Sequence, residues 1–498
     1  MTLFEASVVE IEVSAYGDQY APPRILGLPD ATIRESYYRV ATAFRSLDWS
    51  FPRGQVVINL APAATRKAGS GFDLAIALAL SSLTGRVAAT CLRDALFVGE
   101  VGLDGSLRPV RGILAILDLC VARGIKRLCC PDDDARLALH VETPVEIVPL
   151  RDLTEALAVV SGGRTRQVEP LATRSDANRC EVDIGRVRGQ ESAVEALLIA
   201  AVGGHHMLMS GPPGCGKTLL ARCLPGLLPQ LSRSERLELA RIHSAFDTLD
   251  GVEVARLLDE GRRPFRAPHH TASYAGLVGG GQPIRPGEIT RAHSGVLFLD
   301  EVPEFSRLAL EALRQPIEEG RIVIARAGGI VTLPARFQLV VAMNPCPCGM
   351  LGHPTRPCID TPKQIANYRS RISGPLLDRI DLQLSMQPVD ATQLLREEAP
   401  TTTSAQLRAR VEEGRSRGLE RNGGVLNANL DERSLRRQLA PAAHRLLTTD
   451  GRRAGLSARA IQRILRVART VADLGGSRLI DDEALATALH FRMRVDGA

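Results

Sequence analysis

The sequence has little lysine, few aromatic residues and no long apolar run. Lysine supplies only four of its 62 basic residues, and aromatic side chains make up 4% of the 498 residues. Because a membrane helix needs about 20 consecutive apolar residues, the sequence predicts no membrane-spanning helix. The first residues, Met1-Thr-Leu-Phe-Glu-Ala, lack the basic-then-apolar layout of a secretion signal. We therefore expect a cytoplasmic protein with no membrane partner.

The cysteine count excludes a disulfide scaffold, whereas the charge leaves nucleic-acid binding open. Ten cysteines in a chain of this length do not indicate the dense disulfide framework of a small secreted domain. The net charge of +6 is mild and does not by itself indicate nucleic-acid binding. Arginine suits phosphate contacts, but a GC-rich genome produces the same excess of arginine over lysine. The length predicts two or three domains.

A complete phosphate-binding loop lies near the middle of the chain. The apolar run 206–210 predicts a buried strand, and the run 219–222 predicts the first turn of a helix. Glycines between them let backbone N–H groups turn toward phosphate, and the helix N-terminus adds its positive dipole end. We expect Lys217 to reach the β- and γ-phosphates and the Thr218 hydroxyl to hold Mg²⁺. The predicted nucleotide-binding residues are Gly211, Pro212, Pro213, Gly214, Cys215, Gly216, Lys217, Thr218 and Leu219.

A second apolar strand ends in a pair of carboxylates. The run Gly295-Val-Leu-Phe-Leu precedes Asp300 and Glu301. In nucleotide hydrolases the first carboxylate of such a pair sits at Mg²⁺, and the second polarises the attacking water. A buried strand that ends in Asp-Glu by chance is the alternative, which the phosphate-binding loop upstream makes weak. Together the two motifs predict an enzyme that binds a nucleoside triphosphate with Mg²⁺ and hydrolyses it.

Shifts in composition divide the chain into domains. Residues 1–165 are predicted to form one α/β domain, and the polar stretch 166–183 is a linker. Residues 184–390 are predicted to form a second α/β domain, which holds both motifs. Residues 391–498 are predicted to be helical.

Local patterns within these domains predict individual elements. The run 55–60 predicts a strand, and 110–122 predicts a helix that ends at Gly124. Two further helices are predicted near 405–418 and over 457–474, the second with apolar positions at helical spacing.

Three longer stretches carry a family signature. They are Pro264-Phe-Arg-Ala-Pro-His-His-Thr-Ala-Ser273, Met343-Asn-Pro-Cys-Pro-Cys-Gly349 and Ile372-Ser-Gly-Pro-Leu-Leu-Asp-Arg-Ile-Asp381. In these stretches, and almost end to end, the chain resembles the Mg-chelatase-like AAA+ ATPases of the ComM/YifB group. The resemblance implies an α/β fold with a Lon-protease-like (ribosomal-protein-like) N-terminal domain, an AAA+ P-loop core and an α-helical C-terminal lid. It also implies a homo-hexameric ring that migrates DNA branches during recombination of incoming DNA.

The resemblance gives three more residues of the ATP site. Asn344, after the strand 338–343, matches the residue that senses the γ-phosphate, although an Asn there can also cap a turn. Arg379 matches the arginine finger that reaches the neighbouring subunit's ATP, with a salt bridge to Asp378 or Asp381 as the alternative. Arg459 matches the sensor arginine of the lid, with a plain surface arginine as the alternative.

Two hairpins are expected to line the channel of the ring and contact DNA. The run 322–333 has two alternating apolar segments around a Gly-Gly turn, and Arg326 matches the basic tip residue of related helicases. The glycine-rich segment 279–285 is the second candidate. The expected phosphate contacts are Arg326, Arg285 and Arg321, which would grip the DNA backbone without reading its sequence. Hairpins that only pack subunits together are the alternative.

Three cysteines next to the sensor asparagine resemble part of a metal site. Cys346 and Cys348 are followed by Cys358, but Asp360 stands where relatives carry a fourth cysteine. Three thiolates with Asp360 or His353 would complete a tetrahedral Zn²⁺ site. Reduced structural cysteines are the alternative interpretation.

Two other functions are consistent with parts of the pattern. A magnesium chelatase motor that drives metal insertion into a porphyrin would share the core and lid, but generally lacks this N-terminal domain. An ATP-dependent protease would need a serine and a lysine. The resemblance to Lon puts Gly71 at the serine's place, with Ser70 one residue early, and Leu114 at the lysine's place. We therefore expect an inactive protease-like domain.

Overall fold

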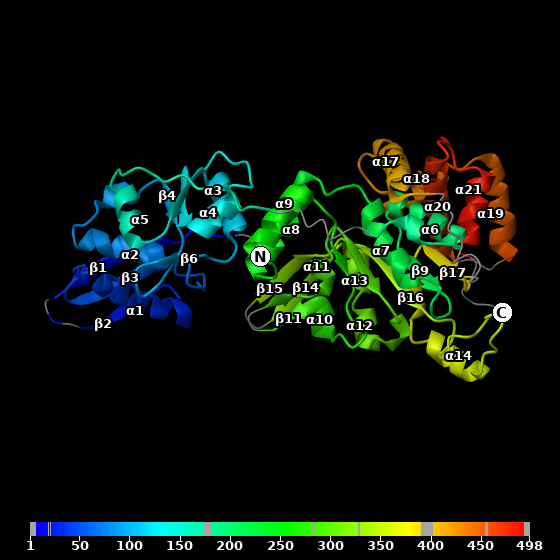
Figure 1. Ribbon diagram of the computed structural model, residues 1–498, viewed down its shortest axis with the longest axis horizontal. Helices are drawn as coiled ribbons and strands as arrows, with labels where there is room; N and C mark the ends of the chain where they lie inside the picture. Colours follow the sequence, from blue (N-terminus) through cyan, green and yellow to red (C-terminus); the bar gives the residue numbers. More distant parts are fainter. Residues whose placement is uncertain are drawn as a thin grey trace. The chain divides into compact units, whose positions relative to one another are not determined.

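The computed structural model describes residues 6–17, 19, 21–173, 182–281, 284–326, 329–389, 402–453 and 457–492. The chain forms two compact units (Figure 1). The first comprises Met1–Ser175 and Ser232–Gly261, and the second comprises Asp176–Leu231 and Arg262–Ala498. Among the described helices, none has both the length and the apolar character that crossing a membrane requires.

The first unit contains two three-stranded sheets. In one sheet, β3 (Gln55–Ala61) lies between β1 (Glu10–Tyr16), which is antiparallel to it, and β2 (Ala21–Leu26), which is parallel. The other sheet is parallel, in the order β4-β7-β8. The strands of this second sheet are β4 (Ala95–Phe97), β7 (Arg127–Pro131) and β8 (Glu146–Leu150). The other elements of the first unit are α1 (Ala31–Ser46), α2 (Asp73–Leu83), η1 (Ala89–Leu92), β5 (Glu100–Val101), β6 (Leu107–Arg108), α3 (Ile113–Arg123), α4 (Asp132–Ala138) and α5 (Leu153–Val160).

Two helices from the middle of the chain complete the first unit. Helices α8 (Arg233–Phe246) and α9 (Gly251–Glu260) fall within the segment 184–390 predicted to form the ATPase core. They pack instead on α3 and α4, where Ala240 and Val254 join a buried apolar cluster with Leu117 of α3. The predicted core is therefore not continuous in space, because the apolar faces of these helices are buried against the N-terminal unit.

The second unit is built on a five-stranded parallel sheet. Its order is β10-β13-β16-β9-β17, with strands β10 (Phe265–Arg266), β13 (Val296–Leu299), β16 (Gln338–Met343), β9 (Met207–Ser210) and β17 (Leu382–Ser385). Every residue of β9, β13 and β16 is buried, as expected for a parallel sheet covered on both faces. The carboxyl ends of these three strands meet at one edge of the sheet, which is where ligands bind in such folds.

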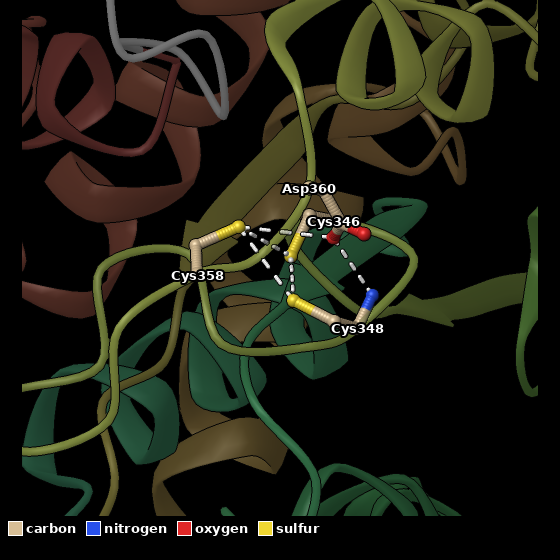
Figure 2. A group of neighbouring side chains, drawn as sticks. All are labelled: Cys346, Cys348, Cys358 and Asp360. Atoms are coloured by element: carbon tan, nitrogen blue, oxygen red, sulfur yellow. Dashed lines mark hydrogen bonds between the residues drawn. The ribbon is translucent and has the colours of Figure 1, made fainter.

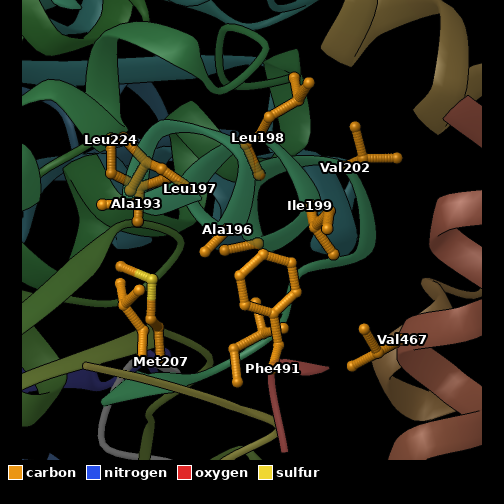
Figure 3. Packing of buried hydrophobic residues seen from close by; sticks show 14 of the residues in the cluster. Ala193, Ala196, Leu197, Leu198, Ile199, Val202, Met207, Leu224, Val467 and Phe491 are labelled. Carbon is orange, nitrogen blue, oxygen red and sulfur yellow. The ribbon is translucent and has the colours of Figure 1, made fainter. Parts of the chain in front are cut away.

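Apolar side chains join this sheet to the helices around it. Leu197 and Ile199 of α6 (Glu191–Gly203) lie in one buried cluster with Met207 of β9 and Leu224 of α7 (Lys217–Leu227) (Figure 3). Val467 of the C-terminal helix α20 (Ala458–Leu474) belongs to the same cluster. Because this core spans the sheet and the C-terminal helices, the two parts of the unit are packed together.

Two hairpins and a set of helices make up the rest of the second unit. Strands β11 (Gly279–Gly280) and β12 (Arg285–Pro286) form one antiparallel hairpin, and β14 (Arg321–Arg326) and β15 (Gly329–Pro334) form the other. The helices are η2 (Ile184–Arg186), α10 (Tyr274–Val278), α11 (Glu288–Arg291), η3 (Val302–Glu304), α12 (Arg307–Glu311), α13 (Arg314–Glu319), α14 (Pro362–Arg369), α15 (Gly374–Leu377), α17 (Ser404–Arg421), η4 (Asn427–Asn429), α18 (Glu432–Arg436), α19 (Pro441–Arg453), α20 (Ala458–Leu474) and α21 (Asp482–His490).

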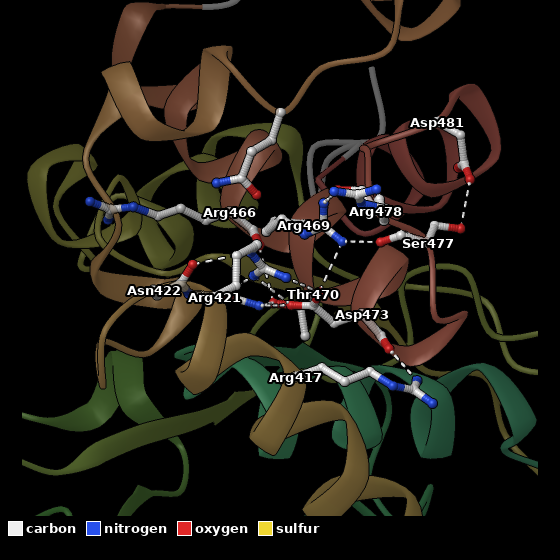
Figure 4. Close-up of polar contacts among 12 residues, drawn as sticks. Arg417, Arg421, Asn422, Arg466, Arg469, Thr470, Asp473, Ser477, Arg478 and Asp481 are labelled. Carbon is white, nitrogen blue, oxygen red and sulfur yellow. Dashed lines mark hydrogen bonds and ion pairs between the residues drawn. The ribbon is translucent and has the colours of Figure 1, made fainter.

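A buried carboxylate ties the C-terminal helices to one another. Asp473 of α20 accepts hydrogen bonds from Arg469, at 2.9 Å, and from Arg421 of α17, at 2.8 Å (Figure 4). Asn427 also donates to Asp473, at 2.8 Å. Arg469 is fully buried, so its charge depends on this partner.

A second buried carboxylate ties the lid to the sheet. Asp381, just before β17, accepts from Nδ1 of His205 and from Arg463 of α20, both at 2.9 Å. Nε2 of the same histidine is 2.7 Å from the Thr470 hydroxyl. Burial by itself raises the pKa of the Asp381 carboxyl, but the bond from His205 and the charge of Arg463 hold that pKa well below its usual range.

We expect Asp381→Ala to destabilise the second unit strongly. The substitution leaves His205 and Arg463 without their buried partner, which typically costs about 3–5 kcal/mol. Because the folded-state pKa of Asp381 is depressed, its stabilisation is present above the unfolded-state pKa of about 3.9 and is lost as the pH falls below it. Urea denaturation at neutral pH measures the loss. The control Glu412→Ala, exposed on α17, should change stability by less than about 0.5 kcal/mol. Equal losses of stability in the Asp381→Ala and Glu412→Ala proteins would contradict the stabilising role of Asp381.

Candidate functional site

The phosphate-binding loop lies at the carboxyl edge of the sheet. It follows β9 and runs directly into α7, which begins at Lys217. Gly214 and Gly216 have φ angles of 82° and 89°, in the left-handed region that favours glycine. These glycines let the loop turn around the N-terminus of α7, where backbone N–H groups would face the phosphates of a nucleotide.

The buried Lys217 ammonium connects the loop to the neighbouring strand. It donates to the carbonyl oxygens of Gly211, at 2.6 Å, and Pro212, at 3.0 Å. It also lies 3.2 Å from Oδ1 of Asn344, which follows β16. The predicted γ-phosphate sensor is therefore beside the predicted phosphate-binding lysine.

The two predicted Mg²⁺ ligands are in direct contact. The Thr218 hydroxyl donates to Oδ2 of Asp300 at 2.8 Å, although 82 positions separate them in the chain. Asp300 follows β13 at the carboxyl edge, one strand away from Asn344. A hydroxyl and a carboxylate are the oxygen ligands that Mg²⁺ takes in such sites.

Glu301 lies next to this pair in an uncommon backbone conformation. Its φ of 49° and ψ of 45° place it in the left-handed region, so its side chain departs from the direction of the strand. Its carboxylate is 3.4 Å from Nδ1 of His270, a contact that the sequence motifs did not predict. The stretch Pro264–Ser273 holds this histidine after β10, the edge strand beside β13.

Comparisons with known proteins identify the family. Models of the magnesium chelatase subunit ChlI match residues 9–134 and 183–394, and a model of its C-terminal part matches 401–492. The uncharacterized protein YifB of Escherichia coli is 39% identical over 470 residues, which cover 94% of this chain and 91% of that one. The competence protein ComM of Haemophilus influenzae is 38% identical over 482 residues, 95% of this chain and 92% of that one. The chain belongs to the ComM/YifB family of magnesium-chelatase-like AAA+ ATPases.

Membership of the ComM/YifB family confirms the predicted fold class and supports the predicted ATPase activity. A 146-residue stretch is also 30% identical to Lon protease 2 of Bacillus subtilis, covering 28% of this chain and 26% of that one. The chain is thus an α/β protein with a Lon-protease-like N-terminal domain, an AAA+ core and C-terminal helices. ATP and Mg²⁺ are the nucleotide and metal that an AAA+ ATPase family implies.

The first unit holds the positions that match the catalytic serine and lysine of Lon. Leu114 of α3 is buried in an apolar cluster. The hydroxyl of Ser70 donates to the carboxylate of Glu100. Leu114 thus has a packing role, and the partner of Ser70 is a carboxylate.

Arg379 lies at the opposite edge of the sheet from the phosphate-binding loop. Asp381, two residues later, donates its backbone N–H to His206, which precedes β9, whereas Lys217 follows the far end of that strand. The Arg379 guanidinium pairs with Glu318 of α13 and donates to Pro375 O at 2.6 Å. The partner is therefore neither Asp378 nor Asp381, and Arg379 does not join the site of its own chain.

The other predicted site residues are spread over the second unit. Arg459 is exposed in the first turn of α20 and makes no hydrogen bond or ion pair with another described residue. Arg285 is exposed at the start of β12. Arg321 lies at the base of the β14–β15 hairpin, where it pairs with Glu319 at 3.1 Å. Arg326 ends β14 beside the turn, and its side chain is outside the described residues.

A pocket next to the phosphate-binding loop was not predicted. Its volume is about 860 Å³, and its walls include Val187, Gln190, Leu407 and Val471. Gln190 donates to the carbonyl of Cys215 in the loop at 3.3 Å, so one end of the pocket adjoins the loop. This position suits the base and ribose of a nucleotide, whose binding leaves no motif as distinctive as that of the phosphates.

The cysteines predicted to bind metal do come together (Figure 2). The potential ligand atoms of Cys346, Cys348, Cys358 and Asp360 lie within 4.8 Å of one another. His353, the alternative fourth ligand, instead accepts hydrogen bonds from the backbone N–H groups of Thr355 and Arg356 at 3.2 Å each. Among the described residues, Asp360 is therefore the fourth member of the cluster.

Proposed function

We propose that this protein is an ATP-driven ring motor that moves along DNA and migrates DNA branches during recombination of incoming DNA. The observation that carries the proposal is the likeness to the competence protein ComM over nearly the whole of both chains. The assembled Lys217, Thr218, Asp300 and Asn344 supply the ATP-hydrolysing centre that such a motor needs. A magnesium chelatase motor is less favoured, because YifB and ComM also match through the N-terminal domain.

The proposed ring is a homo-hexamer with ATP bound between subunits. Arg379 and the phosphate-binding loop lie at opposite edges of the same sheet, separated by the length of β9, about 10 Å. An arginine in that place can serve the nucleotide of an adjacent copy. Its Nε is buried without a hydrogen-bond partner among the described residues, so this donor is unused and can bond a phosphate once the side chain turns away from Glu318.

The proposed DNA contacts come from the two hairpins. Both are insertions that flank β13 in the chain, and they place Arg285 and Arg326 at or near their tips. Guanidinium groups there would neutralise backbone phosphates of any sequence. Arg321, at the hairpin base and already paired with Glu319, is proposed to contribute less.

We expect Arg326→Ala to weaken DNA binding and DNA-stimulated hydrolysis more than basal hydrolysis. Arg326 lies beside the turn of the β14–β15 hairpin and belongs to none of the elements that carry the ATP site, so Lys217 and Asp300 stay in place. Loss of one phosphate contact should weaken binding to all DNA sequences about equally. It should also make the slope of log affinity against log salt concentration shallower by about one unit per contact. The measurement is affinity for a four-way junction against salt concentration, alongside ATPase with and without that junction.

A surface arginine outside both hairpins provides the control for this experiment. Arg433→Ala, exposed on α18, removes the same charge and should leave junction affinity unchanged. Equal affinities of the Arg326→Ala and native proteins would make the subunit-packing role of this hairpin the better interpretation. No stimulation of the native ATPase by any DNA would contradict the DNA motor itself.

Zinc is part of the same proposal as a structural cofactor. Its ligands are Cys346, Cys348, Cys358 and Asp360, the group that the structure gathers after β16. Three thiolates and a carboxylate supply four ligands of kinds that zinc binds, and four is the coordination number of structural zinc sites.

A further inference from the structure

The spacing within the cysteine cluster fits a tetrahedral metal. The Sγ atom of Cys346 is 3.4 Å from that of Cys348 and 3.6 Å from that of Cys358, and the last two are 3.6 Å apart. The Cys358 sulfur is 3.7 Å from Oδ2 of Asp360. Ligands around Zn²⁺, at about 2.3 Å for sulfur and 2.1 Å for oxygen, lie about 3.6–3.8 Å from one another. The three sulfurs and the Cys358–Asp360 pair are therefore spaced close to a filled site, and the other two sulfur–oxygen pairs lie within 4.8 Å.

Backbone hydrogen bonds orient two of these ligands. The N–H of Leu351 donates to Sγ of Cys346 at 3.3 Å, and the N–H of Cys348 donates to Oδ2 of Asp360 at 2.8 Å. Such outer contacts fix ligand direction in metal sites. Cys346 is fully buried, whereas Cys348 and Cys358 are half-buried, so an ion has a route from solvent.

The loop that carries this cluster is built onto the ATP site. Only Pro345 separates Cys346 from Asn344, whose amide contacts Lys217. Three residues after Cys346, Gly349 has a φ of 79° and packs on the phosphate-binding loop. A Cβ added to Gly349 would lie 2.8 Å from Cδ of Pro213, closer than real side chains allow. The loop that carries the cysteine cluster therefore contacts the phosphate-binding loop, and Asn344 at its start contacts Lys217.

We infer that a metal ion bound in the loop 345–360 keeps the loop rigid and thereby holds the ATP site in the shape that binds nucleotide. We call this role of the loop the brace. When the four ligands hold one ion, the chain between Cys346 and Asp360 is closed into a rigid loop. Asn344 is then held toward Lys217, and Gly349 is held against Pro213. Without the ion, three neighbouring thiol groups and Asp360 no longer constrain the loop, and the phosphate-binding loop loses its support. The inference rests on the proposed zinc site and is independent of the proposed action on DNA.

The first experiment asks whether the cluster holds a metal. The full-length protein, freed of metal, is titrated with Co²⁺ alone while the thiolate-to-cobalt absorption band is recorded. One ion should bind per chain, and Asp360→Ala should weaken binding by more than about a hundredfold, since even outer contacts contribute 10- to 100-fold. The matched control His353→Ala, in the same loop, should bind cobalt like the native protein. No band in the native protein, or equal losses in both variants, would overturn the site.

The second experiment measures the coupling without hydrolysis or DNA. The affinity of a fluorescent ATP analogue is compared in zinc-loaded and metal-free native protein, both returned to the same Mg²⁺ concentration. Zinc should tighten nucleotide binding by about tenfold, within the range usual for coupled sites. Because coupling is reciprocal, ATP should tighten cobalt binding by the same factor. Since the native chain is used throughout, a folding defect of a variant cannot produce this result.

The outcomes separate the brace from the other proposals. Metal binding with no change in nucleotide affinity would overturn the brace and leave the zinc site standing. If metal and nucleotide binding are coupled but DNA does not stimulate the ATPase, the brace is supported and only the DNA motor is contradicted. Asp360→Cys, which completes four thiolates, should bind metal at least as tightly as native and keep the coupling. Loss of coupling in that variant despite bound metal would also count against the brace.

Discussion

Glu301→Gln is expected to leave ATP bound while slowing its hydrolysis by about 10²- to 10⁴-fold, the usual contribution of a positioned general base. Glu301 follows Asp300 at the carboxyl edge of the sheet, and its left-handed backbone conformation turns it away from the strand. Its carboxylate makes no contact with Lys217 in the structure, so phosphate binding does not depend on it. An amide of the same shape cannot accept a proton from the attacking water.

The measurement pairs a binding assay with single-turnover hydrolysis. Lys217→Ala should lose nucleotide binding itself, because the ammonium is the phosphate ligand of the loop. Glu304→Gln is the matched control: it lies three residues along, is exposed and pairs with Arg371 at 3.0 Å. It should hydrolyse ATP at close to the native rate. If Glu301→Gln also did so, the water-activating residue would have to be another one.

The candidate ATP site could be located from sequence because short local patterns encode it, and the structure brings those patterns together. Glycines with positive φ, a lysine at the start of a helix and carboxylates at the end of a strand are each required where they stand. The strand expected at 55–60 is β3, and the helix expected over 110–122 is α3, closed by Gly124 in the left-handed conformation. The helix near 405–418 is longer, α17 over Ser404–Arg421, since its Thr403 capping box sets an earlier start.

Contacts between distant segments could not be predicted in the same way. Nothing in the periodicity of 232–261 says which domain buries the apolar faces of α8 and α9. The approach of His270 to Glu301 depends on β10 lying beside β13, which is a property of sheet order. The pairing of Arg379 with Glu318 likewise joins residues 61 positions apart by number, and an arginine with two nearer aspartates gave no reason to choose Glu318.

Arg379→Ala is expected to abolish hydrolysis in a uniform ring while each subunit still binds ATP. The structure gives the reason: Arg379 precedes β17 at the edge of the sheet opposite Lys217, so it does not contribute to the nucleotide site of its own chain. A finger that neutralises charge on the transferring phosphoryl group is worth about 10³- to 10⁵-fold in rate. Nucleotide affinity should change far less, since the phosphate-binding loop is intact.

Mixing two inactive variants tests whether this arginine acts between subunits. Rings assembled from Arg379→Ala and Lys217→Ala subunits contain some interfaces with an intact Lys217 on one side and an intact Arg379 on the other. Those interfaces should hydrolyse ATP, so activity should rise from near zero and peak at intermediate mixing ratios. A mixture of Lys217→Ala with Glu301→Gln subunits is the control, because both residues belong to the same side of the interface and no complete site can form. Mixed rings that form but stay inactive at every ratio would show that Arg379 does not act in trans, and its ion pair with Glu318 would then be its whole role.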